Sequence, residues 1–516
     1  MKRFWLVLLS LGLALGFSTS AFAVDVKFSG SFYAAGMYLD KTNFLKNDYA
    51  GNSLGKTDPL AINVDALSAG HSTAFYYQRL RVETDFIFSP NLRLVTRFDA
   101  LERIWGGARG DTPKETGFIP LGYNNQVYDS QSAGTRTENQ NIAFDWAYIS
   151  WISPVGFLEI GYQTDNNWGT VFGNNEFNGP PAAKIAWIAP LTPEPYRAGV
   201  TVQITKINDR SSSAIAPSFA TDSDNDQYVL AVVGMPAKGV DFGLLFAYQR
   251  VALDRTAEFV EPYVFPSKAK INAYMLTPFF KAKSGPFYLE GEFDYVFGKI
   301  TWEKDSSYVG PVFGIDKGST TDIVNIMAYL NGVVDFGMFY GGATFAYVSG
   351  DDSKTPVSKL EGGLVDGGPD FQPCLMMFNS DRNYWAGGLR GYGYAYSGMM
   401  VGSGGPAPDK GVLANAWFYQ GKIGARPIAG LDIMASVSYA EADKRPSGVS
   451  FFNIQPVLYK DYGWEIDVVG TYKLTNNLSY MLGAAYWFVG DYYKGNSDAN
   501  QLVNNYMLIN KLTLTF

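Results

Sequence analysis

Two groups of charged side chains recur at short, even spacings along the chain. The basic group comprises Arg79, Arg81, Arg93 and Arg97. The acidic group, about two hundred residues further on, comprises Glu290, Glu292 and Asp294. Such groups attract or repel ions and polar solutes, but they supply neither a nucleophile nor a redox centre. The chemistry that they indicate is electrostatic.

The residues that usually carry catalysis are scarce. His71 is the only histidine, and no serine partner for it is evident, although a hydrolase of the Ser–His type needs both. Residues 50–57 match a relaxed phosphate-loop pattern, but Asp58-Pro59 follows where that motif requires a helix. Cys374 is the only cysteine, so the chain has no internal disulfide. We expect no enzymatic activity and no cofactor.

Three aspartates alternate with other residues in one predicted loop. They are Asp222, Asp224 and Asp226. Clustered carboxylates suit Ca²⁺, but a calcium loop needs glycine at its sixth position and glutamate at its twelfth. Gln227 and Val233 stand there instead. These aspartates are therefore weak metal candidates, and a solvated acidic loop is the favoured interpretation.

The composition is that of a large strand-forming chain. Only 17% of the 516 residues are charged, whereas 16% are aromatic and 55 are glycine. The mean hydropathy is −0.07, and beyond residue 23 no run approaches the roughly 18–20 apolar residues of a membrane-spanning helix. Disordered chains lack aromatic residues, so disorder is excluded as well.

The N-terminus has the pattern of an export signal. Lys2 and Arg3 precede an apolar run over residues 5–17, and Ala21-Phe22-Ala23 forms a cleavage pattern. We predict a signal peptide over residues 1–23, which predicts an exported protein. Its removal takes away two positive charges and changes the formal net charge from −8 to −10. An acidic exported protein is a poor candidate for binding nucleic acid.

Many segments alternate between apolar and polar residues, as barrel strands in membranes do. In residues 462–474, Trp464 and Ile466 fall on one side, whereas Glu465 and Asp467 fall on the other. Residues 72–88, 92–104 and 286–297 follow the same rule. A soluble β-sandwich also alternates, but its apolar side forms the core.

Short and long connections between the predicted strands alternate along the chain. Short turns are predicted near 89–91, 153–154, 191–195, 236–239, 284–285, 331–332, 426–430 and 475–477. Long loops are predicted near 40–71, 106–139, 164–183, 208–226, 253–268, 303–320, 350–411, 443–460 and 492–502. These connections separate 18 antiparallel strands, with 16 as the alternative, in one transmembrane up-and-down barrel over residues 24–516.

The last segment resembles the final strand of Gram-negative outer-membrane barrels. Its apolar residues share one face and end the chain; they are Tyr506, Leu508, Leu512, Leu514 and Phe516. Together with the signal peptide and the connection pattern, this makes the whole mature chain resemble an outer-membrane porin, although no subfamily is indicated. Phe516 would then belong to the signal for membrane assembly.

The resemblance implies a function and several partners. Porins let ions and small hydrophilic solutes diffuse passively through a water-filled bore, are commonly homotrimers embedded in outer-membrane lipids, and fold one external loop inward. The third long loop, 164–183, has the corresponding order in this chain. Its candidate constriction residues are Asp165, Trp168 and Glu176.

Two interpretations of the charged groups remain open. In a ring of 18 strands, the acidic group lies directly across from the basic group, which predicts a transverse field over the bore. Alternatively, a turn centred on Pro90 sets Arg97 opposite Glu83 and Asp99 opposite Arg81, and these would be cross-strand ion pairs of the wall.

A substrate-specific channel, for example for carbohydrate, is the second functional hypothesis. Sugar rings have apolar faces that stack on aromatic side chains. Five tryptophans fall on or near predicted inward positions: Trp105, Trp151, Trp168, Trp417 and Trp487. A one-residue error in register would move each of them to the other face of its strand.

Overall fold

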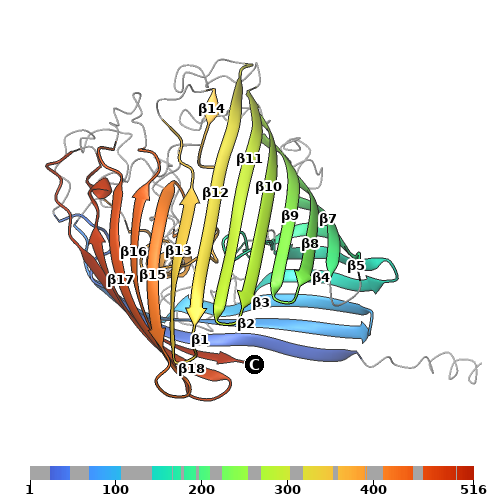
Figure 1. Cartoon of the computed structure of the whole chain (residues 1–516), viewed down its shortest axis with the longest axis horizontal. Helices are drawn as coiled ribbons and strands as arrows, with labels where there is room; N and C mark the ends of the chain where they lie inside the picture. Colours follow the sequence, from blue (N-terminus) through green and yellow to red (C-terminus); the bar gives the residue numbers. More distant parts are fainter. Residues whose placement is uncertain are drawn as a thin grey trace, which may run out of the picture.

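Long antiparallel strands form a closed ring (Figure 1). The computed structural model describes residues 24–46, 69–105, 142–164, 167–175, 179, 181–192, 197–209, 224–253, 269–302, 318–352, 358–389, 391, 411–445, 457–495 and 497–516. One sheet holds nineteen strands, of which β14 has only two residues. The other eighteen close the ring, because β1 pairs with β2 along one edge and with β19 along the other. The predicted 18-strand barrel is confirmed.

The strands follow one another around the ring in chain order. Their bounds are β1 Asp25–Leu39, β2 Thr73–Ser89, β3 Leu92–Ile104, β4 Ile142–Ser153, β5 Gly156–Thr164, β6 Pro181–Pro190, β7 Ala198–Asn208, β8 Asn225–Ala237, β9 Val240–Leu253, β10 Ala269–Ser284, β11 Phe287–Trp302, β12 Thr320–Asp335, β13 Phe339–Val348, β14 Lys359–Leu360, β15 Ala416–Ala425, β16 Leu431–Ala442, β17 Asp461–Lys473, β18 Leu478–Val489 and β19 Asn505–Thr515. Strand β14 pairs in parallel with β12 where β12 continues past the end of β13.

Among the described residues, helix is confined to short pieces. Helix α3 (Ser380–Ala386) begins after Asn379, whose side-chain oxygen accepts the Arg382 amide at 2.7 Å. A 3₁₀ turn, η6, covers Asp491–Lys494. Within the described ranges, no helix has the length and apolar character needed to cross a membrane.

The alternation of side chains places apolar residues outside and polar residues inside. On β17, Trp464 is 50% exposed, whereas the next residue, Glu465, is fully buried. On β19, Leu508 and Leu514 are exposed on the outer surface, whereas Asn505 is buried. This pattern is the reverse of that in a soluble sandwich, and it suits a barrel whose outer surface meets lipid.

One predicted turn lies elsewhere. Asn331-Gly332 remains inside β12, and the chain turns at residues 336–338 between β12 and β13. The Asn331 side chain donates to Glu290 at 3.1 Å and accepts from Thr344 at 3.0 Å. It is therefore held by neighbouring strands and does not build a local turn.

Gly337 is the residue that this turn requires. Its φ of +85° lies in the left-handed region, and its amide donates to Asp335 at 2.8 Å. We expect Gly337→Ala to lower the free energy of unfolding in detergent by about 1–2 kcal/mol, the usual strain of a left-handed non-glycine residue.

Gly421→Ala is the matched control for this prediction. A Cβ at either glycine would meet no atom within 4 Å, but only Gly337 has a positive φ. We expect the Gly421 variant to unfold at the wild-type urea concentration or slightly above it. Equal destabilisation of the two variants would contradict the assignment of strain to the turn.

Candidate functional site: the lumen of the barrel

Each arginine of the basic group contacts a carboxylate on the lumen wall. The register places Arg81 opposite Asp99 and Glu83 opposite Arg97, as the turn at Pro90 predicts. Arg81 binds Asp99 through two hydrogen bonds of 2.7 Å each. The cross-strand arrangement is therefore confirmed for this pair.

The other three arginines have acidic neighbours of their own. Arg79 is paired with Glu102, and Arg93 lies 3.0 Å from Asp85. Arg97 lies 3.4 Å from Asp145 and stacks on the Trp146 ring, with 3.7 Å between the guanidinium carbon and the ring centre. The wall between β2 and β4 is thus a network of both signs of charge.

The acidic group faces the lumen but does not meet open water. Glu290, Glu292 and Asp294 are 8%, 4% and 1% exposed. Glu290 accepts hydrogen bonds from Tyr288, Tyr329 and Asn331. Their strand, β11, is nine positions around the ring from β2, as expected. Any transverse field across the bore must therefore come from buried carboxylates on β11 and from ion-paired arginines on β2 and β3.

We predict that removing the basic group makes the channel more selective for cations. Replacing Arg79, Arg81, Arg93 and Arg97 together by Gln leaves their carboxylate partners uncompensated. The reversal potential across a KCl gradient should then move towards the cation limit. Arg93→Gln alone should move it less in the same direction, because this side chain is 47% exposed and is the most accessible of the four.

The control for this prediction is Arg445→Gln. Arg445 is exposed beyond the end of β16 and donates to the Leu458 carbonyl. A reversal potential unchanged in the fourfold variant would show that the arginines act only as wall structure.

A first inner segment, residues 167–175, packs against the inward faces of β9 to β12. The Thr170 amide donates to Glu292 at 2.5 Å, and the Trp168 indole donates to the Thr277 carbonyl at 3.1 Å. Phe172 stacks on Tyr329 with 5.4 Å between the ring centres. Trp168 therefore lies within the barrel, whereas Asp165 and Glu176 fall outside the described residues.

A second inner segment, residues 371–389, was not predicted. The Met376 and Met377 amides donate to the two oxygens of Glu465 on β17, each at 2.7 Å. Trp385 packs on Tyr77 of β2, with 4.6 Å between the ring centres. This segment thus lies inside the ring and contacts the wall at both β17 and β2, which are four strands apart.

A sequence signal for the second segment existed. Residues 374–378 read Cys-Leu-Met-Met-Phe, an apolar run inside a loop assigned to solvent. Cys374, Met376, Met377 and Phe378 are each 4% exposed or less.

Near the start of this loop, Asp351 accepts the Glu361 amide at 2.9 Å, and burial raises the pKa of Asp351 to about 6.

Both inner segments are fixed by the same short motif. Glu292-Phe293-Asp294 lies on β11 and Glu465-Ile466-Asp467 on β17. Glu292 accepts one backbone amide from an inner segment and Glu465 accepts two, and in each motif the aspartate two positions later is buried on the same inward face. A carboxylate that accepts two buried N–H groups satisfies donors that the loop backbone would otherwise leave unpaired.

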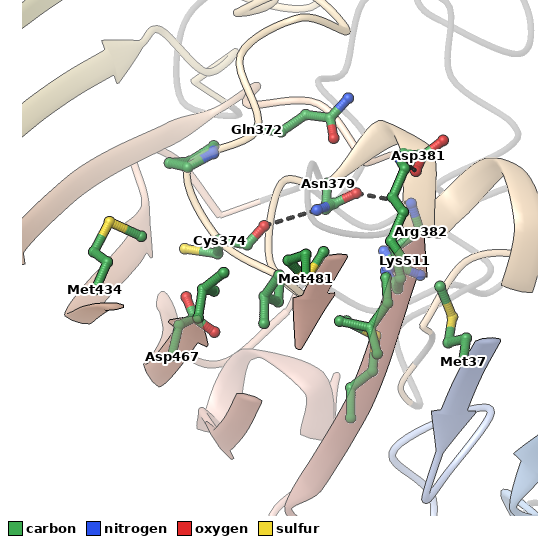
Figure 2. Close-up of a pocket in the computed structure, with 15 residues that line it drawn as sticks. Met37, Gln372, Cys374, Asn379, Asp381, Arg382, Met434, Asp467, Met481 and Lys511 are labelled. Atoms are coloured by element: carbon green, nitrogen blue, oxygen red, sulfur yellow. Dashed lines mark hydrogen bonds and ion pairs between the residues drawn. The ribbon is translucent and has the colours of Figure 1, made fainter. Parts of the chain in front are cut away.

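A cavity of about 250 Å³ lies beneath the second inner segment. Figure 2 shows Cys374 and Asp467 in its wall, with Met434 and Met481 to either side of them. Lys511 and Arg382 lie at another part of the same wall (Figure 2).

The tryptophans do not line an open path. Trp487 is fully buried, and Trp168 packs edge-on against Phe279. Trp151 is 45% exposed on the outer face, because its neighbour Ser150 is the buried, inward residue. Trp105 lies against the outward Tyr76 with 5.5 Å between the ring centres, and Trp417 occupies the strand position next to the inward, buried Phe418. The inward prediction was wrong for Trp105, Trp151 and Trp417 because of a one-residue register difference.

The acidic loop before β8 is occupied by a basic side chain. Lys206 lies 2.9 Å from both Asp224 and Asp226. Asp222 falls outside the described residues. The lysine ammonium takes the position between these carboxylates that a cation would need.

The architecture is similar to that of solved outer-membrane proteins. OccAB3 of Acinetobacter baumannii has a TM-score of 0.46 and 9% identity, over 95% of this chain and 100% of that chain. OccK9 (OpdG) of Pseudomonas aeruginosa has a TM-score of 0.44 and 13% identity, over 95% and 99%. The outer membrane channel DcaP of A. baumannii has a TM-score of 0.40 and 10% identity, over 96% and 99%.

No family model matches the chain, and no curated protein matches it. The fold is established by the chain's own strand pairing. The protein is an eighteen-stranded transmembrane β-barrel with an apolar outer surface, a charged lumen wall and two segments folded into its bore.

Proposed function

We propose that the chain forms a water-filled channel in the Gram-negative outer membrane, through which ions and small hydrophilic solutes diffuse passively. The observation that carries this proposal is the distribution of side chains on a closed barrel, with exposed apolar residues outside and charged residues inside. Barrels of this size enclose a lumen wide enough for water.

The proposed path runs beside the two inner segments, along the wall of β2 to β5. Inward residues there stay half-exposed, among them Glu83, Asp85 and Glu159. Arg93 adds a basic side chain that is 47% exposed. A path lined by both signs of charge suits polar solutes of either charge and requires no bound cofactor.

The proposal includes how the protein reaches the membrane. The signal peptide, residues 1–23, would be cleaved on export, and Phe516 would help the barrel assemble. The Phe516 backbone pairs with Gly30 of β1 through bonds of 2.9 and 3.1 Å, so the last residue takes part in ring closure. We expect a homotrimer surrounded by outer-membrane lipids, and no catalytic activity.

A substrate-specific channel is the second candidate. The observation that favours it is the presence of two inner segments, which bring wall and loop residues close to any passing solute. The tryptophans do not line an open path, so they do not favour carbohydrate over other solutes.

Recording from the purified protein in a planar lipid bilayer tests the proposal. A general channel gives discrete conductance steps and a linear solute flux. A specific channel gives saturable block of the ion current by its solute. Absence of conductance steps from protein shown to be folded would reject both candidates.

A further inference from the structure

Three potential metal ligands meet where the second inner segment touches the wall. The Cys374 sulfur and one carboxylate oxygen each from Glu465 and Asp467 lie within 4.8 Å of one another, and all three residues are buried. Cys374 belongs to the inner segment, whereas the two carboxylates belong to β17. The group therefore joins two separate parts of the fold.

The Asp467 carboxylate lacks some of the hydrogen bonds that its oxygens could accept. Its side chain is 2% exposed, it lines the cavity beneath the segment, and one of its oxygens has no hydrogen-bond partner among the described residues. Its other oxygen accepts a long bond of 3.4 Å from Ser436, and the Leu375 amide and the Glu465 carboxyl also contact this carboxylate. A buried carboxylate in this condition is costly unless a proton or a cation balances it.

The nearby cationic side chains do not neutralise the charge of the Asp467 carboxylate. Within the described residues, neither Glu465 nor Asp467 forms an ion pair with a lysine or arginine. Lys511 pairs with Asp381 at 3.8 Å and lies over the Tyr33 ring at 4.0 Å. Arg382 donates to two backbone carbonyls, those of Met376 and Gly387.

We propose that Cys374, Glu465 and Asp467 bind a divalent transition-metal ion of the zinc class. Zinc takes thiolate and carboxylate ligands at about 2.0–2.3 Å. Ligand atoms that already lie within 4.8 Å of one another reach a shared ion after small side-chain rotations. Each Glu465 oxygen accepts one amide and keeps a second lone pair for the ion. The cavity supplies room for water as the fourth ligand.

Such an ion would pin the second inner segment to the wall. The amide bonds to Glu465 already hold residues 376 and 377, and a metal bond to Cys374 would fix the preceding residues as well. Metal binding does not depend on conduction, so a failure of this inference is distinguishable from a failure of the proposed channel function.

Cobalt serves as the spectroscopic probe, because thiolate–Co²⁺ bonds absorb in the near ultraviolet. The folded full-length mature protein in detergent is titrated with Co²⁺. Since Cys374 is the only cysteine, any such band reports this residue. We expect about one Co²⁺ per chain, displaced by Zn²⁺, with no thiolate band in Cys374→Ser. We expect Asp467→Asn to bind roughly tenfold more weakly or worse, since even second-shell changes have that effect.

Asp294→Asn is the matched control. Asp294 occupies the equivalent position in the other Glu-x-Asp motif, is equally buried, and has no cysteine beside it in the described cluster. This variant should keep the cobalt band. Absence of the band from folded wild-type protein, or an unchanged Co²⁺ affinity in Asp467→Asn, would overturn the proposal. A proton shared between Glu465 and Asp467 would then be what reduces their negative charge. Equilibrium dialysis of the wild type against Zn²⁺ decides the question without any variant: clearly substoichiometric retention rejects the site.

Discussion

Replacing residues 372–389 by a glycine–serine linker of equal length is expected to raise the single-channel conductance roughly two- to fivefold, because conductance follows the open cross-section of the bore. These residues contain the contacts to Glu465, Tyr77 and Lys511 that hold the second inner segment inside the ring. A linker without their apolar side chains has nothing to pack there. Planar-bilayer recording in symmetric salt measures the change.

The control replaces residues 446–456, in another long loop, by the same kind of linker. We expect this variant to keep the wild-type conductance. If the first replacement left the conductance unchanged in folded protein, the second inner segment would not border the conducting path.

Glu465→Ala is expected to have the largest effect of any single substitution considered for this chain. It removes the acceptor of two buried backbone amides, each of which costs about 1–3 kcal/mol when left unpaired, so the total is about 2–6 kcal/mol. Thermal unfolding in detergent, followed by gel mobility with and without heating, measures it. Glu465→Gln retains one carbonyl acceptor and should fall between the alanine variant and the wild type.

Glu441→Ala provides the comparison on the neighbouring strand, β16. The Glu441 carboxylate accepts one bond, of 3.3 Å, from Tyr439. We expect its loss to change stability by no more than about 0.5–1 kcal/mol, as surface substitutions usually do. Equal losses in the two alanine variants would contradict a special anchoring role for Glu465.

The ring was predictable because its information is local. Alternation with a period of two assigns each side chain to a face, and the turn residues set the register. Pro90 therefore sufficed to place Arg81 opposite Asp99, and the apolar face of the last strand predicted the exposed Leu508 and Leu514. Where another interaction competed, the local signal failed: Asn331 has the type of a turn residue, but its side chain hydrogen-bonds to Glu290, which lies opposite it on the neighbouring strand β11.

The site depended on the tertiary structure. The sequence by itself determined that charged residues such as Glu292 and Glu465 point inward, because strand alternation allows no other arrangement. It did not determine what covers them. Met376 reaches Glu465 from 89 residues away, and Thr170 reaches Glu292 from 122 residues away. Such contacts form only when the amide donors of a loop meet carboxylate acceptors and apolar surface inside the closed ring, and no short-range pattern in the chain records that match.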